Sequence, residues 1–301
     1  MNNTLIVIQG PTGIGKSRLS IQLAKYFNTE IISSDSRQIF KELSIGTAVP
    51  APEDLKTIPH HLIHSHSIQE NFNASRFENE ALAIITTLFR QYQAIIMTGG
   101  SMLYVDVVCK GIDDQPDVDP EIREKINREF EEHGIEYLRM KLKKLDETYY
   151  HQVDLKNPKR LIRALEVCLM TGKPFSSFRT EKIKKRPFQI LKIGLNTDRE
   201  KLYAQINQRV DQMMEAGLEE EARNIYPFKH LNPLNTVGYK ELFAYFDGKI
   251  TRENAIELIK RNSRHYARKQ LTWLRKDQQI QWFEPTQLNE IIHFIGQNIK
   301  K

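Results

Sequence analysis

Cysteine is scarce in this sequence of 301 residues, with only Cys109 and Cys168 present. Two cysteines without Cys-x-x-Cys spacing argue against a disulfide framework and a zinc knuckle, so we expect two buried, reduced thiols. No apolar run approaches the roughly 18 residues of a membrane span, which argues against an integral membrane protein. The apolar run at 5–8 is too short for a signal peptide and no basic segment precedes it, so we expect a cytoplasmic protein.

The composition also lacks the extremes of disordered or fibrous chains. Hydrophobic residues make up 40% and charged residues 27% of the sequence, which is typical of a globular protein. The length predicts about two structural units, or one large domain with an insertion. Basic side chains number 44 against 38 acidic ones, and the net charge of +6 is compatible with a polyanionic partner.

Short apolar runs that end near turns predict a parallel sheet. The run at 5–9 is followed by a helical pattern at 16–27, in which Leu19, Leu23 and Phe27 share one face. Strand, helix and strand in this order indicate βαβ units. The strands that we expect are at 5–9, 30–34, 94–98, 188–195 and 280–283.

From about 116 to 185 the β-type runs are absent and helix signals replace them. Asx-Pro pairs at 119–120 and 157–158 are typical helix starts, and Gly134 and Gly172 are suitable helix ends. We therefore expect an α/β core formed by residues 1–115 and 186–301, with an all-helical domain inserted at 116–185.

A phosphate-binding loop follows the first expected strand. The sequence there matches G-x-x-x-x-G-K-[ST], between a strand and a helix as that motif requires. Backbone N–H groups and the helix N-terminus can hold a phosphate, Lys16 adds a point charge, and the Ser17 hydroxyl can ligate Mg²⁺. Arg18 stands where a dinucleotide loop would need its third glycine. The expected phosphate ligands are Gly10, Pro11, Thr12, Gly13, Ile14, Gly15, Lys16 and Ser17.

An acidic residue follows the second expected strand instead of the strand at 94–98, which ends in Thr-Gly-Gly-Ser. The carboxyl ends of parallel strands share one edge, so Asp35 should face the same crevice as the phosphate loop. There it can ligate a metal, orient a ribose or accept a proton, or it can simply form a turn.

Taken together, the motifs resemble the tRNA dimethylallyltransferase (tRNA isopentenyltransferase) family. They occur in the family's order and span most of the chain. The matching segments are GPTGIGKS (10–17), SSDSRQIFK (33–41), IGTAVP (45–50), PHHL (59–62), TGGSMLY (98–104), NPKRLIRALEV (157–167), QRVDQMMEAGLEEE (208–221), VGYKE (237–241) and RKQLTWLR (268–275).

The resemblance implies a P-loop NTPase-like parallel sheet core and a reaction. The family transfers a dimethylallyl group from dimethylallyl diphosphate to N6 of the adenosine just 3′ of the anticodon in tRNA. Lys16 and Mg²⁺ on Ser17 would stabilise the leaving diphosphate, and Asp35 aligns with the family's general base. Arg209 aligns with a position linked to diphosphate or substrate orientation. The resemblance also implies a monomeric, bacterial form without the eukaryotic zinc finger.

Further residues carry over by the same resemblance. Ser36, Arg37 and Gln38 align with the stretch that holds the target adenosine, and Ser101 stands where the family usually has Thr. Phe40, Val49 and His64 depart from the family's usual Tyr, Lys and Asp, which leaves tRNA fine specificity open. Together with Asp35, Ser36, Arg37, Gln38 and Ser101, the implied tRNA-binding residues are Arg123, Lys159, Arg160, Leu161, Ile162, Arg163 and Arg268.

Three charged or polar clusters have more ordinary interpretations as well. Residues 252–276 carry eight Lys or Arg against two acids, and Lys260, Arg264 and Arg268 fall on one helical face. This face is either solvated or, as the resemblance favours, in contact with tRNA phosphates.

The histidines at 60, 61, 64 and 66 suggest loop packing more than a metal site. The acidic run at 219–221 is expected to be an exposed helix face.

Two other functions remain compatible with the residues alone. A small-molecule or nucleoside kinase would use the same loop, with the helical insertion as a lid. A non-catalytic RNA-binding module would use the basic helices, although Asp35 and the intact Gly-Lys-Ser argue against it.

Overall fold

The structure is a computed structural model that describes residues 3–113, 116, 119–180 and 183–299. The chain divides into two compact units, which we name by their content. The sheet unit comprises Met1–Lys110 and Lys185–Lys301, and the helical unit comprises Gly111–Lys184. The sequence predicted the boundaries between these two units at 115/116 and 185/186.

The sheet unit contains six parallel strands in the order β3-β2-β4-β1-β5-β6. The expected parallel α/β fold is confirmed, and all five predicted strands are present. Their bounds, with that of β3, are β1 Thr4–Gln9, β2 Ile31–Ser33, β3 His60–His61, β4 Ala94–Thr98, β5 Gln189–Leu195 and β6 Gln281–Phe283.

The strand β3 was not predicted, because the sequence indicated a loop around the histidines. It adds only two residues to the edge of the sheet, where His60 pairs with Ile31 and His61 with Ile32. A two-residue strand has no room for a repeating apolar pattern, so tertiary pairing decides its conformation.

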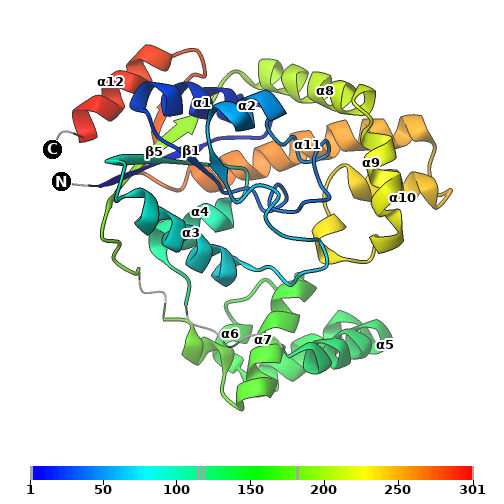
Figure 1. Ribbon diagram of the computed structural model, residues 1–301. Coiled ribbons are helices and arrows are strands. Elements are labelled where there is room, and N and C mark those ends of the chain that lie inside the picture. The colour runs from blue at the N-terminus through cyan, green and yellow to red at the C-terminus, as the bar shows by residue number, and fades with distance from the viewer. Residues whose placement is uncertain (1–2, 114–115, 117–118, 181–182, 300–301) are drawn as a thin grey trace. The chain divides into compact units, whose positions relative to one another are not determined.

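Helices cover both faces of the sheet. Side chains alternate along β1, so Ile6 and Ile8 pack with residues of α1 and α12 while Leu5 and Val7 are buried on the other face. Figure 1 shows α1 and α12 on one side of the sheet and α3 and α4 on the other. The helices of this unit are α1 Lys16–Phe27, α2 Pro52–Thr57, α3 Ala74–Leu88, α4 Met102–Lys110, α8 Arg199–Glu215, α9 Leu218–Ile225, α10 Tyr239–Phe246, α11 Arg252–Leu274 and α12 Leu288–Ile299, with 3-10 turns η2 Tyr226–Phe228 and η3 Asn232–Leu234.

The helical unit has its own apolar core. Asp119 and Asn157 cap their helices through side-chain oxygens, and Gly172 ends α7 in the left-handed conformation, as the sequence predicted. Gly134, at φ 73°, separates two helical segments within α5. The elements are α5 Pro120–Leu145, α6 Glu147–Tyr150, α7 Pro158–Thr171 and the 3-10 turn η1 Phe175–Phe178, around a core that includes Ile126, Leu138, Leu142, Leu161, Leu165 and Phe175.

Both cysteines are buried and free, as expected. Within the described residues, no helix is long and apolar enough to cross a membrane.

Candidate active site

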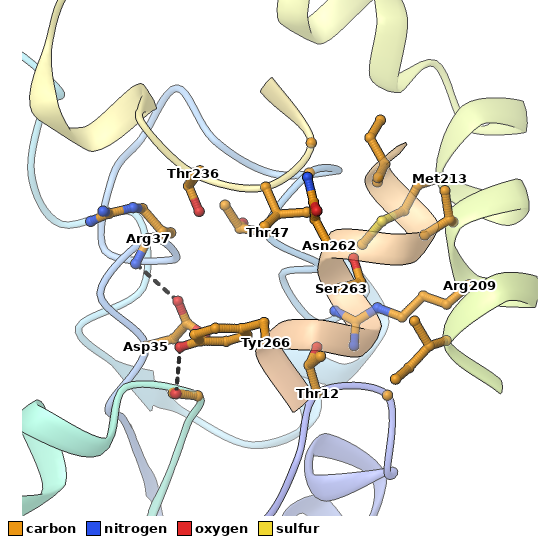
Figure 2. A pocket seen from close by; sticks show the side chains of 18 of the residues that line it. Thr12, Asp35, Arg37, Thr47, Arg209, Met213, Thr236, Asn262, Ser263 and Tyr266 are labelled. Atoms are coloured by element: carbon orange, nitrogen blue, oxygen red, sulfur yellow. Dashed lines mark hydrogen bonds between the residues drawn. The ribbon is translucent and has the colours of Figure 1, made fainter. Parts of the chain in front are cut away.

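Three loops meet at the carboxyl edge of the sheet. The phosphate loop follows β1, Asp35 follows β2, and Gly99 and Gly100 follow β4. Two adjoining cavities of about 490 and 400 Å³ open there, and Figure 2 shows the side chains around the larger one. Both cavities are lined by Thr12, Gly13, Asp35, Thr47, Gly100, Arg209 and Tyr266.

The phosphate loop has the conformation that its glycines allow. Gly13 and Gly15 take φ values of 82° and 97°, in the left-handed region that favours glycine. Gly13 also packs against α8, since a Cβ on it would lie 2.8 Å from Cγ1 of Ile206. The Lys16 ammonium donates to the carbonyl oxygens of Gly10 and Pro11, each at 3.0 Å. Ser17 is exposed in the first turn of α1.

Burial, followed by the nearby Arg209 guanidinium, lowers the pKa of Lys16 to about 8, while Asp35 opposes this shift. A lysine with this pKa is partly neutral in mildly alkaline solution. The charge of Lys16 therefore depends on pH in a range where most lysines stay protonated.

We predict that the affinity for inorganic diphosphate decreases as the pH rises through about 8. The protonated ammonium binds the anion and the neutral amine does not, so raising the pH removes the binding form. Isothermal titration with diphosphate between pH 7 and pH 9.5 measures this, with Lys16→Arg as a control that keeps its charge. A flat profile in the wild type would contradict the prediction.

The two carboxylate oxygens of Asp35 have different surroundings. Its Oδ1 accepts the backbone N–H groups of Arg37 at 2.9 Å and Gln38 at 3.3 Å, so the carboxylate does form a turn. Its Oδ2 lies near Gly100, since a Cβ added to Gly100 would be 3.0 Å from this oxygen. One oxygen thus shapes the backbone and the other lies beside Gly100, while Asp35 as a residue lines both cavities.

The residues after Asp35 shape the same cavity. Gln38 donates from Nε2 to the carbonyl oxygens of Thr47 and Ala48, and its Oε1 accepts from the Ser33 hydroxyl. This side chain is therefore committed to holding the loop. Ser36 and Arg37 line the larger cavity, as does Ser101.

Arg209 enters the cavity from α8, and Figure 2 shows its guanidinium pointing inward. Burial lowers the pKa of Arg209, and the charge of Asp35 acts in the opposite direction. Arg209 lines both cavities, so it contacts the space beside Lys16 of the phosphate loop as well as the space beside Arg37 and Ser101.

Glu221 contradicts the prediction of an exposed acidic face. Its carboxylate accepts the backbone N–H groups of Ser44, Ile45 and Gly46 at 2.8–3.0 Å and the hydroxyl of Tyr239 at 2.7 Å. It thereby anchors the loop that carries Thr47 into the cavity. A run of three glutamates contains no local signal that one of them turns inward.

The clustered histidines contact different partners. Within the described residues, no group of three or more His, Cys, Asp or Glu side chains could hold a metal ion. The imidazoles of His61 and His66 lie 2.6 and 3.2 Å from carboxylates, while the other two contact neutral oxygens. The pairs are His61 with Glu30, His66 with Glu80, His60 with the Ile58 carbonyl, and His64 with Ser44 and the Leu43 carbonyl.

The basic side chains of α11 do not form the single face that the sequence predicted. Lys260 pairs with Asp211 at 2.8 Å, and Arg264 donates to Oδ1 of Asn207, so both turn toward α8. Arg268 is exposed and, with Lys269, lines a neighbouring shallow pocket. The helical period alone could not show that α8 covers part of this face.

The predicted tRNA-binding residues of the helical unit differ in their surroundings. Arg123 holds the fully buried Glu166 through two hydrogen bonds of 2.5 and 3.1 Å, and Arg163 lies 3.6 Å from the same carboxylate. Leu161 has no exposed surface and belongs to the core, so this structure contradicts its assignment to tRNA contact. Ile162 also packs against this core. Arg123 stays 45% exposed beside this ion pair, and within 159–163 the exposed residues are Lys159 and Arg160.

Comparison with known proteins explains the arrangement. A family model described as IPP transferase matches residues 38–277. A protein of Bacteroides fragilis named tRNA dimethylallyltransferase 1 is 54% identical over 297 residues, which cover 99% of both chains. The chain belongs to the tRNA dimethylallyltransferase family.

Other members of the tRNA dimethylallyltransferase family agree in sequence and structure. The enzyme of that name from Cytophaga hutchinsonii is 48% identical over 100% of this chain and 99% of its own. The solved structure of a tRNA isopentenylpyrophosphate transferase from Bacillus halodurans matches with a TM-score of 0.73 and 34% identity, over 100% of this chain and 97% of its own. A eukaryotic dimethylallyltransferase acting on tRNA matches with a TM-score of 0.79 and 28% identity, over 95% of this chain and 75% of its own. This tRNA dimethylallyltransferase family member is therefore an enzyme that transfers a prenyl group to tRNA.

Proposed function

We propose that the enzyme transfers the dimethylallyl group of dimethylallyl diphosphate to N6 of the adenosine 3′ of the anticodon. The observation that carries this proposal is one crevice lined by the phosphate loop, Lys16 and Asp35. We also propose that it acts as a monomer in the cytoplasm, where its tRNA substrate is found.

The residues support a substitution at the first carbon of the isoprenoid. The N6–C bond forms while the C–O bond to diphosphate breaks, and N6 must lose a proton because an aromatic amine is a poor nucleophile. Asp35 accepts that proton through Oδ2, since Oδ1 is already engaged by two backbone N–H groups. Lys16 and the phosphate-loop N–H groups stabilise the charge that develops on the leaving diphosphate.

The phosphate loop also fits a magnesium ion. Mg²⁺ typically takes few protein ligands and shares phosphate oxygens and water, and the exposed Ser17 hydroxyl beside the loop suits such a set. The ion would add positive charge next to the diphosphate. No nucleotide needs to be hydrolysed for this reaction, so any ATP bound at the loop would compete with the isoprenoid substrate.

The target base must leave its stack to enter the crevice, as in other enzymes that modify bases. The larger cavity is lined by Arg37 and Ser101, which can contact the base or its backbone. Lys269 also lines this cavity, and Arg268 joins it in the shallow pocket farther along α11. These exposed cations can bind phosphates of the anticodon stem-loop.

A labelling experiment tests the proposal. The protein is incubated with Mg²⁺, an anticodon stem-loop RNA, and either labelled dimethylallyl diphosphate or γ-labelled ATP. We expect the isoprenoid label on N6 of the adenosine 3′ of the anticodon and no transfer from ATP. Transfer of phosphate from ATP would support a kinase, and binding of RNA without any transfer would support an RNA-binding module.

We predict that replacing Lys159 and Arg160 together with Ala weakens tRNA binding and lowers the slope of log K against log[salt]. The expected decrease is about 1–2, since each lost phosphate contact removes roughly 0.7–0.9. Filter binding at several salt concentrations measures the slope, and Lys143→Ala, on α5, is a control at another basic site. An unchanged slope would show that these two cations only face solvent. Arg163 is unsuitable for this test because it neighbours buried Glu166.

A further inference from the structure

Gln270 connects the phosphate loop to the loop that faces Asp35. This side chain belongs to α11 and has no exposed surface. A buried amide needs hydrogen bonds at both ends, because an unsatisfied polar group is costly. Its Oε1 accepts the backbone N–H of Thr12 at 2.8 Å, and its Nε2 donates to the carbonyl oxygen of Gly100 at 2.9 Å. The two partners fix the orientation of the amide, since one can only donate and the other can only accept.

The Gly100 carbonyl has a second donor on the same helix. The hydroxyl of Tyr266, one turn before Gln270, donates to it at 3.0 Å, as the dashed line in Figure 2 shows. Burial and then the charge of Asp35 raise the pKa of Tyr266 to about 12, so its hydroxyl stays protonated and remains a donor at neutral pH. Two side chains of α11 therefore hold one carbonyl group.

Gly100 is packed closely on Asp35. A Cβ on Gly100 would lie 3.0 Å from Oδ2 of Asp35, and one on Gly99 would lie 2.3 Å from the carbonyl carbon of Ser34. Backbone hydrogen bonds join the same segments, from Ser34 N–H to Thr98 and from Ser101 N–H to Ser34. A displacement of the Gly99-Gly100 loop must therefore also displace Asp35.

We propose that Gln270, assisted by Tyr266, is a positioning residue that sets the distance between the Asp35 carboxylate and the phosphate loop. This inference rests on the proposed function, in which Asp35 takes the proton of N6 and the phosphate loop holds the leaving diphosphate. Asp35 acts on N6 and the phosphate loop acts on the leaving diphosphate. Because N6 and the diphosphate oxygen are both partly bonded to the same isoprenoid carbon during transfer, the distance between Asp35 and the loop matters. Gln270 acts through Gly100 and Thr12, and a misplacement of about 1 Å can cost about 10²-fold in rate.

The test replaces Gln270 with methionine, which has a similar length and volume but makes neither hydrogen bond. We expect the single-turnover rate of prenyl transfer to decrease about 10²-fold, while the dissociation constants for dimethylallyl diphosphate and for tRNA remain unchanged. Gln278→Met, at an exposed position just beyond α11, is the matched control and should keep the wild-type rate. A wild-type rate in Q270M would overturn the inference.

A second variant separates hydrogen bonding from space filling. Q270E keeps an acceptor for Thr12, and its carboxyl group can donate to the Gly100 carbonyl only in the protonated form, which burial favours. Q270E should therefore be faster than Q270M at low pH and lose this advantage as the pH rises. Equal rates of Q270E and Q270M at every pH would count against the inference.

Tyr266→Phe covers the case in which Q270M does not fold, as judged by circular dichroism. It removes one donor from Gly100 and should lower the single-turnover rate without changing either dissociation constant. If Q270M folds, the double variant should lose less than the product of the two single losses, because both donors share one acceptor. An unchanged rate in Y266F, with Q270M unfolded, would overturn the inference.

The outcomes also distinguish this inference from the proposed function. If the wild type fails to transfer the isoprenoid to tRNA, the proposed function is wrong. If the wild type transfers it, Asp35→Asn does not, and Q270M is as fast as the wild type, only the positioning role of Gln270 is wrong.

Discussion

Replacing Asp35 with asparagine is expected to lower kcat for prenyl transfer by about 10²–10⁴-fold, the usual cost of losing a general base. Asparagine keeps an oxygen that can accept the N–H groups of Arg37 and Gln38, so the turn should persist. What it loses is the basic oxygen beside Gly100. We therefore expect the thermal unfolding temperature and the affinities for tRNA and dimethylallyl diphosphate to stay close to wild type.

Asp35→Ala provides the comparison, because it removes both the base and the turn-forming oxygen. It should match D35N in its loss of kcat and additionally lower the unfolding temperature. Steady-state kinetics at saturating substrates and differential scanning calorimetry measure both effects. A D35N enzyme with near wild-type kcat would remove Asp35 from the mechanism and leave it a turn-forming residue.

Replacing Lys16 with alanine is expected to reduce kcat/KM for dimethylallyl diphosphate by at least about 10²–10³-fold, the cost of one donor that stabilises developing charge. The ammonium donates to the carbonyl oxygens of Gly10 and Pro11, and under the proposed function it would contact the diphosphate. Its attraction grows as the C–O bond breaks, so kcat should decrease as well as KM increase. Binding of tRNA should be unaffected.

The matched control is Lys25→Ala, which removes an exposed lysine from the last turn of the same helix. It should leave both kinetic constants at wild-type values. The measurement is steady-state prenyl transfer with varied isoprenoid at saturating tRNA. Equal losses in K16A and K25A would show that the effect is general electrostatics, and rescue of K16A by added ATP would contradict a direct role in holding the diphosphate.

Local sequence patterns predicted the parts of the site that lie within short segments. The phosphate loop, α1 and Asp35 follow from the spacing of glycines, apolar residues and one acid at the ends of strands, and each is where that spacing places it. Asx-Pro pairs and glycine likewise predicted the helix ends in the helical unit. These features depend on residues that are neighbours in the sequence, so a single sequence is enough to predict them.

Partners that are distant in sequence could not be predicted in this way. Gln270 reaches Thr12 across 258 positions, and Glu221 reaches Gly46 across 175. Lys260 was expected to face phosphates, but Asp211 on α8 pairs with it. Each of these side chains has an ordinary local pattern, and only the packing of one helix against another decides what it contacts.

The contact of Gly46, Glu221 and Tyr239 joins three separate sequence motifs, at 45–50, 208–221 and 237–241. A Cβ on Gly46 would lie 2.6 Å from the Tyr239 ring, whose hydroxyl donates to Glu221, and Glu221 holds the Gly46 N–H. Each of these residues therefore limits which side chains fit at the other two positions. During divergence these positions can change only in concert, so a substitution at one should be accompanied by compensating ones in the other two segments. Covariation among the three would be the evolutionary trace of this single contact.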